Sequence, residues 1–209
     1  MAKTPPVGEG VPALPSKGFV DLGNYAWAAD AINELAEAGI IKGTSETTFS
    51  PANNITRADF ALLLVRAFEL SSDNTENFAD VQSSDYFASE LAIARNTGIV
   101  GGIGDNKYAP RNTITRQDMM VIVYRALQKL NADDSLTPVG EGLSALPMTD
   151  EVETSYPDFD SVAPYAADAV AYLINAGLVN GKNGRIDPTA YTTRAEVAVL
   201  IKRILDYIK

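Results

Sequence analysis

The sequence contains neither cysteine nor histidine among its 209 residues. Their absence excludes disulfide bonds, Cys/His zinc sites and every catalytic pair that depends on a cysteine or a histidine. Positive charge is also scarce, because 17 Lys and Arg stand against 27 Asp and Glu, which gives a net charge of -10. Surfaces that bind nucleic acid are usually basic, so this balance argues against DNA or RNA as a partner.

Long hydrophobic runs are missing as well, so we expect no membrane insertion. Residues 1–17 are rich in Pro and Gly and have no apolar segment, so they are predicted to be a linker rather than a signal peptide. The chain is nevertheless 46% hydrophobic, which is enough to build a substantial buried core.

One pattern occurs three times along the chain. Ile55–Arg57 recurs 59 residues later as Ile114–Arg116, and again 78 residues further on as Thr192–Arg194. Glycine pairs, prolines and aromatic residues keep nearly the same offsets, which indicates a repeat architecture. The predicted units are residues 18–72, 77–131 and 157–209, with linkers at 1–17 and 132–156.

Each unit is predicted to fold as helix, loop, helix. In unit one, apolar residues at helical spacing precede Gly39, which is expected to end the first helix as a C′ glycine. The second helix carries an almost unbroken apolar run, Phe60–Val65 in unit one, and must therefore be buried on most sides. The predicted fold class is mainly α, with three helix-loop-helix repeats forming a pseudo-threefold, trimer-like body around a central three-helix bundle.

The start of each second helix combines a threonine, an arginine and an acid. Thr56 and Asp59 have the spacing of a capping box, and capping by itself explains both residues. It does not explain the arginine that follows the threonine, because the helix dipole disfavours a cation there. The three motif arginines are Arg57, Arg116 and Arg194.

Each motif arginine therefore needs a partner. One alternative is an internal ion pair with the acid of the same box or of a neighbouring unit. The other is a bound anion, since a guanidinium beside free N–H groups at a helix start suits a carboxylate or a phosphate. The sequence leaves both alternatives open and makes the three arginines candidate binding residues.

Three further sets of residues recur. The aromatic set begins the first helices: Trp27, Tyr86 and Tyr165. These rings either fasten the helix to the core or line a groove and pack on a sugar face. The glycine set is predicted to adopt a positive φ in a turn, or to let a ligand approach the backbone: Gly43, Gly102 and Gly181. The acidic set opens the units and either caps the first helices or accepts sugar hydroxyls: Asp21, Asp80 and Asp160.

Together, these motifs resemble the repeats of the S-layer homology domain family. Unit one matches the family pattern nearly throughout, in the order Phe19–Asp21, Trp27, Gly39–Gly43, Phe49–Pro51 and Ile55–Asp59. Unit two has Gln117 and Asp118 where the family has Ala and Glu. Unit three has Thr192 in place of an apolar residue and lacks one loop residue.

The resemblance implies a three-pronged pseudo-trimer with grooves between adjacent units. It implies that the module holds a secreted Gram-positive surface protein on the cell wall by binding a secondary cell-wall polysaccharide. The implied ligand is a pyruvate-ketal N-acetylmannosamine, whose carboxylate would contact Arg57, Arg116 or Arg194. Because units two and three depart from the pattern, the groove that contains Arg57 ranks first.

No set of residues suggests catalysis, because the acids recur in three copies at capping positions. We therefore expect a non-catalytic, carbohydrate-binding module without cofactor or metal, monomeric in isolation and located outside the cell in the wall or S-layer. The alternative is a protein–protein or S-layer self-assembly scaffold that binds no glycan.

Overall fold

The structure is a computed structural model, and it describes residues 18–132 and 156–208. Within these ranges the chain is mainly helical and has no strand, which confirms the predicted fold class. The helices are α1 (Ala26–Glu37), α2 (Arg57–Ala67), α3 (Ala88–Asn96), α4 (Arg116–Ala132), α5 (Ala167–Asn175) and α6 (Arg194–Tyr207), with short 3-10 helices at Gly23–Tyr25, Phe159–Ser161 and Pro164–Ala166. The predicted linkers, 1–17 and most of 132–156, lie outside the described residues.

The first helix of each unit ends at a glycine, as expected for Gly39. This residue has a φ of 72°, and Gly98 and Gly177 have φ values of 80° and 67°. In unit one, Gly39 donates its N–H to Ala36 at 3.0 Å and Ile40 donates to Leu35 at 2.9 Å, which is the pattern of a Schellman motif. The left-handed glycine reverses the chain and sends it into the loop between the two helices.

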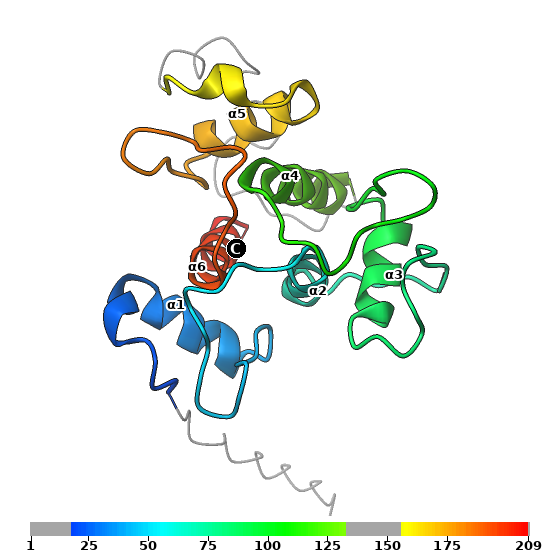
Figure 1. Ribbon diagram of the computed structural model, residues 1–209, viewed down its shortest axis with the longest axis horizontal. Helices are drawn as coiled ribbons and strands as arrows, with labels where there is room; N and C mark the ends of the chain where they lie inside the picture. Colours follow the sequence, from blue (N-terminus) through cyan, green and yellow to red (C-terminus); the bar gives the residue numbers. More distant parts are fainter. Residues whose placement is uncertain (1–17, 133–155, 209) are drawn as a thin grey trace, which may run out of the picture.

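The helices that pack together come from different units. α1 packs against α6, α3 against α2, and α5 against α4. Figure 1 shows these three pairs spread around the middle of the molecule, with α2, α4 and α6 inside and α1, α3 and α5 outside. Each first helix therefore lies on the second helix of the preceding unit, and unit one closes the ring on unit three.

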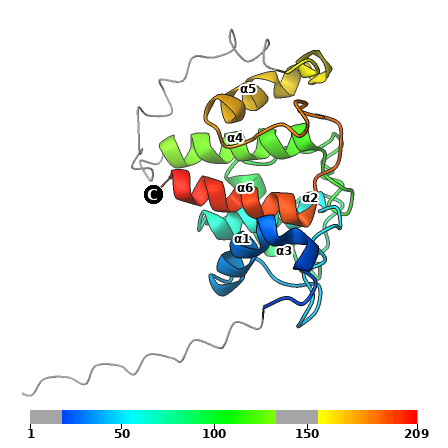
Figure 2. The ribbon, with the colours of Figure 1, turned by 90° about the vertical axis from the view of Figure 1, so that its left-hand side faces the viewer.

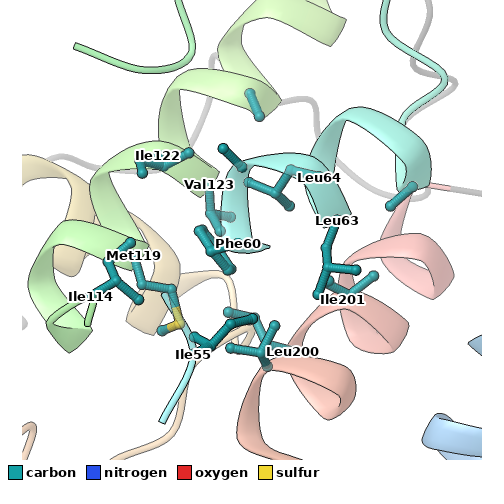
Figure 3. Close-up of a cluster of buried hydrophobic side chains, with 14 of the residues drawn as sticks. Ile55, Phe60, Leu63, Leu64, Ile114, Met119, Ile122, Val123, Leu200 and Ile201 are labelled. Carbon is teal, nitrogen blue, oxygen red and sulfur yellow. The ribbon is translucent and has the colours of Figure 1, made fainter. Parts of the chain in front are cut away.

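The second helices meet in an apolar centre. α2 contacts both α4 and α6, and Figure 3 shows side chains of all three helices in one cluster. Phe60, Leu64, Val123 and Ile201 are fully buried. Such burial on most faces is what the unbroken apolar run predicted. The pseudo-threefold symmetry of the body stays a prediction.

Figure 2 shows many of the loops gathered at the end of the body where α4 and α6 begin. Thr56 pairs with Thr113, Thr115 with Tyr191, and Thr193 with Asn54, each as an isolated antiparallel β-bridge. Each bridge joins the N-cap of one unit to the residue two positions before the N-cap of the next unit. The contacts between units therefore repeat in cyclic order, and the candidate site residues lie beside them.

Candidate functional site

The N-terminus of each second helix is held by the loop of the next unit. Arg57 donates its backbone N–H to the carbonyl of Asn112 at 2.8 Å, and Ala58 donates to Pro110 at 3.0 Å. The equivalent bonds run from Arg116 to Ala190, Gln117 to Pro188, Arg194 to Asn53 and Ala195 to Pro51. The expectation of free N–H groups at these helix starts is therefore wrong, because these donors already bind backbone carbonyls.

The threonines cap the helices as predicted. The N–H groups of Asp59, Asp118 and Glu196 donate to the hydroxyl oxygens of Thr56, Thr115 and Thr193, at 3.1, 3.3 and 3.3 Å. At α6 the box is reciprocal, since the N–H of Thr193 donates to the Glu196 carboxylate at 2.8 Å. Asp59 and Asp118 are one methylene shorter, and their carboxylates take other donors.

Each motif arginine also binds the neighbouring unit through its side chain. The Nε–H donates to a loop carbonyl in three equivalent bonds: Arg57 to Tyr108 at 3.0 Å, Arg116 to Ile186 at 2.8 Å and Arg194 to Phe49 at 2.9 Å. The guanidinium groups of Arg57 and Arg194 lie over the rings of Tyr108 and Phe49, 4.6 and 4.4 Å from the ring centres. The cation that the helix dipole disfavours thus has a structural partner in the next unit.

Each motif arginine additionally lines a groove, together with residues from the other two units. Groove A, about 430 Å³, is lined among others by Arg194, Gly43, Asp59, Arg66 and Tyr86. Groove B, about 340 Å³, is lined among others by Arg57, Gly102, Asp118, Arg125 and Tyr165. Groove C, about 390 Å³, is lined among others by Arg116, Gly181, Glu196, Arg203 and Trp27. Nine of the twelve predicted site residues are therefore brought together in these three grooves.

The aromatic residues line the grooves and are not part of the core. Trp27, Tyr86 and Tyr165 are 58, 70 and 63% exposed. The hydroxyl of Tyr86 donates to Asp59 at 2.6 Å, and that of Tyr165 donates to Asp118 at 2.7 Å. Two effects raise the pKa of each tyrosine to about 12: mainly its partial burial, and in second place this hydrogen bond to a carboxylate. Both phenols therefore remain neutral hydrogen-bond donors at neutral pH.

The three glycines are needed for a reason other than the predicted positive φ. Positive φ values occur at Gly39, Gly98 and Gly177, and not at Gly43, Gly102 or Gly181. A Cβ on Gly43 would lie 2.5 Å from the ring of Phe19 and 2.4 Å from the carbonyl of Ser45. At Gly102 and Gly181 a Cβ would lie 2.7 and 2.6 Å from loop carbonyls. Only glycine lets the loop close this tightly at the groove wall.

The opening acids hold loops and do not line the grooves. Both carboxylate oxygens of Asp21 accept backbone N–H groups, from Phe49 at 2.9 Å and Ser50 at 2.7 Å. Asp80 does the same with Tyr108 and Ala109. Neither aspartate lines groove A, B or C. Neither predicted role, as a cap of the first helix or an acceptor of sugar hydroxyls, matches these contacts.

In unit three the equivalent acid is Asp158, so the choice of Asp160 was wrong. Asp158 accepts the N–H groups of Ile186 and Asp187 at 3.0 and 2.8 Å, and is 4% exposed. Burial alone would raise its pKa, but these two donors and Arg185 bring the pKa below its ordinary value. Asp160 is exposed. The offset of 78 residues from Asp80 would have identified Asp158 in the sequence.

Sequence reasoning missed one further set of groove residues. The second helices carry a second arginine nine residues after the first: Arg66, Arg125 and Arg203. Each lines one groove. The signal was present in the sequence, because a cation recurs at the same offsets within an otherwise apolar helix. Each groove thus combines two guanidinium groups, a carboxylate and an exposed aromatic ring.

This combination of groups can bind an acidic sugar. Guanidinium groups pair with carboxylates, and an exposed ring beside them offers a flat apolar surface for the face of a sugar. Within residues 18–132 and 156–208, no cluster of three or more acids is arranged to hold a metal ion. In the same ranges, no helix is long and apolar enough to span a membrane.

The family model of the S-layer homology domain matches residues 18–61, 77–120 and 155–198. These matches cover more than half of the chain, so the chain belongs to the S-layer homology family, as its motifs indicated. The family comprises repeats that bind cell-wall polysaccharide and occur in S-layer proteins and cell-surface enzymes. Membership therefore indicates an extracellular location at the cell surface and is consistent with anchoring to the cell wall.

Curated relatives include surface proteins and enzymes. The chain is 31% identical over 182 residues to an amylopullulanase of Thermoanaerobacterium thermosulfurigenes, a match that covers 86% of the chain and 9% of the relative. It is 31% identical to the exoglucanase XynX of Acetivibrio thermocellus, over 86% of the chain and 16% of the relative. The S-layer protein sap of Bacillus anthracis is 26% identical, over 91% of the chain and 22% of the relative.

The chain thus spans between about a tenth and a quarter of the lengths of these relatives. The enzymatic names belong to much longer proteins, so these matches show no catalytic role for this chain.

Proposed function

We propose that the chain anchors a surface protein to the bacterial cell wall by binding an anionic secondary cell-wall polysaccharide in grooves A, B and C. The observation that carries this proposal is the composition of the grooves, each of which places arginines beside an exposed ring. Several grooves on one rigid body would also engage several sugars of one polymer, which raises the overall affinity.

The candidate ligand is an N-acetylmannosamine that carries a pyruvate ketal. Its carboxylate matches the guanidinium groups, and its apolar face matches the rings of Trp27, Tyr86 and Tyr165, which are more than half exposed. The net charge of -10 would repel an anionic polymer in general, so binding depends on these local cations.

Isothermal titration with a pyruvylated wall saccharide tests the proposal, and binding that disappears when the pyruvate is removed is the expected result. Replacement of the arginines also loosens the contacts between units, because their Nε–H groups bind loop carbonyls. Each Arg→Ala variant should therefore be paired with a thermal melt. Undiminished binding by all three single variants, Arg57→Ala, Arg116→Ala and Arg194→Ala, would remove the motif arginines from the site.

The second candidate function is a protein–protein or self-assembly scaffold, and the similarity to S-layer proteins favours it. Intact wall sacculi and sacculi stripped of polymers other than peptidoglycan separate the two functions. A glycan anchor sediments only with the intact sacculi, whereas a scaffold binds both or neither. Analytical ultracentrifugation tests the accompanying proposal that the isolated module is monomeric.

A further inference from the structure

The second arginine has a different partner in each groove. In groove A, Arg66 donates from Nε and Nη2 to one oxygen of Glu90, at 3.1 and 2.7 Å. In groove C, Arg203 donates from Nη1 to the carbonyl of Leu178 at 3.3 Å. In groove B, Arg125 is exposed and makes no hydrogen bond or ion pair with any residue that the structure describes.

The motif arginines show the opposite pattern. In groove B, Nη1 of Arg57 lies 3.6 Å from Oδ2 of Asp118, so part of its charge is already neutralised. Among the described residues, neither Arg116 nor Arg194 forms a direct ion pair of this kind, although Asp59 still acts electrostatically on Arg194. Arg194 instead donates from Nε and Nη2 to the carbonyls of Phe49 and Lys42, at 2.9 and 2.8 Å. The ion-paired arginine is thus the second arginine in groove A and the motif arginine in groove B.

The loop wall of groove B has a glycine beside Arg125. Gly101 stands where groove A has Lys42 and groove C has Asn180. A Cβ on Gly101 would lie 3.3 Å from Nη1 of Arg125, which is tighter than ordinary van der Waals contact. A larger side chain at this position would crowd the guanidinium, which lines the same groove as the exposed ring of Tyr165.

We propose that Arg125, rather than the motif arginine Arg57, receives the negative charge of the wall saccharide in groove B. Arg194 and Arg116 receive it in grooves A and C. This assignment rests on the proposed function. It adds that the anion binds the second arginine of the repeat in groove B and the motif arginine in grooves A and C. Gly101 acts as a positioning residue, because it keeps the space beside Arg125 open.

A tryptophan reporter in each groove makes the assignment testable. Trp27 is the one tryptophan of the chain, and it lines groove C. The double variant Trp27→Tyr/Tyr165→Trp moves the fluorescent ring to groove B, and Trp27→Tyr/Tyr86→Trp moves it to groove A. The probe is the methyl glycoside of N-acetylmannosamine with a pyruvate ketal, titrated into each full-length reporter.

In the groove B reporter, Arg125→Gln should weaken binding about tenfold or more, because a charge-assisted pair to the carboxylate is lost. Gly101→Asn, which introduces the residue of unit three, should weaken it in the same groove. The matched control is Lys107→Gln in the same reporter, which removes an exposed cation that does not line groove B and should change binding less than about threefold. In the groove A reporter Glu90→Gln, which releases Arg66 from its ion pair, should strengthen binding.

Unchanged affinity of groove B after Arg125→Gln, with an unchanged thermal melt, overturns the assignment and leaves the proposed function standing. Equal losses for Arg125→Gln and Lys107→Gln overturn it as well, since both would then act through general charge. Failure of all three parent reporters to respond to the probe, together with no heat in titration calorimetry, overturns the proposed function and this assignment together.

Discussion

The loops that join the three units and the groove walls beside them derive from the same repeat. The loops keep the same contacts in all three units, whereas the side chains of the walls differ from unit to unit. In the loops, an aspartate, a proline carbonyl and an arginine Nε–H occupy equivalent places three times. On the walls, Tyr86 and Tyr165 correspond to Trp27, and Asp59 and Asp118 correspond to Glu196. Backbone pairing therefore tolerates little change, whereas a groove can be altered one side chain at a time.

The loop contacts should dominate stability, and Asp158→Ala should have the largest effect. Two buried N–H groups would lose their acceptor, so we expect the free energy of unfolding to fall by about 3 kcal/mol. Asp160→Ala, at an exposed position two residues away, should change it by less than about 0.5 kcal/mol. Urea unfolding followed by circular dichroism measures both. Equal effects would mean that the loop of unit three is held differently.

The same carboxylates make the loops sensitive to acid. Burial opposes ionisation of Asp21 and Asp158, but backbone donors bring each pKa below the ordinary value of 3.8. The unfolded chain therefore binds protons first, and the stabilisation present above pH 3.8 is lost as the pH falls through the folded pKa. Unfolding curves between pH 6 and pH 2 should show this loss, and Asp158→Asn should make it shallower. An identical slope for this variant would contradict the contribution of Asp158.

The helix caps should contribute less than the loop carboxylates. Thr193→Ala removes the acceptor of the Glu196 N–H and should lower the free energy of unfolding by about 1 kcal/mol. Thr193→Ser keeps the hydroxyl and serves as the control, with a loss of less than half of that amount expected. Thermal melts measure both variants. A loss at serine as large as that at alanine would show that the threonine methyl group, rather than the cap, matters.

The smallest effects should come from the groove walls. Tyr165→Phe deletes an exposed hydrogen bond to Asp118 and should cost about 0.5 kcal/mol. Because the folded pKa of Tyr165 is about 12, the stabilisation from this hydrogen bond is complete below the ordinary tyrosine pKa of 10 and is lost as the pH rises through 12. Ultraviolet absorbance titration of the parent and of Tyr165→Phe isolates this phenol.

The same titration can compare a phenol in groove C with Tyr165 in groove B. Trp27→Tyr introduces a phenol beside Glu196, whose carboxylate already accepts the N–H of Thr193 at 2.8 Å. We therefore expect the new phenol to titrate nearer to pH 10 than to pH 12. A value close to 12 would show that Glu196 can leave the cap and that the wall of groove C resembles the other two.

Local features were predictable from the sequence because they depend on residues close to each other in the chain. The caps at Thr56 and Thr193, the C′ glycine Gly39 and the apolar second helices follow from spacing alone. The recurring offsets also identified the motif arginines and the three aromatic residues as candidate binding residues. The prediction of Asp160 was wrong because the Phe-Asp pair at residues 159 and 160 mimics the opening of the other units, whereas the repeat offset of 78 residues from Asp80 leads to Asp158.

The remaining features depend on which unit packs against which. Nothing in one repeat shows that α1 lies on α6, or that the first-turn N–H groups of α2 bind the loop of unit two. The steric reason for Gly43 was equally hidden, since the ring of Phe19 reaches it only in the folded loop. Sequence spacing carries no information on such contacts.

Three like helical units, their caps and the residue types available for binding an acidic sugar could all be predicted from the sequence, because these are properties of short segments. How the grooves are assembled depends on the packing of the units against one another. Arg194 meets the carbonyl of Phe49 across 145 residues, and each groove draws its arginines, glycine and aromatic ring from all three units. The physical reason is that no unit can bury its apolar helix alone, so each lies on its neighbours and the grooves form where they meet.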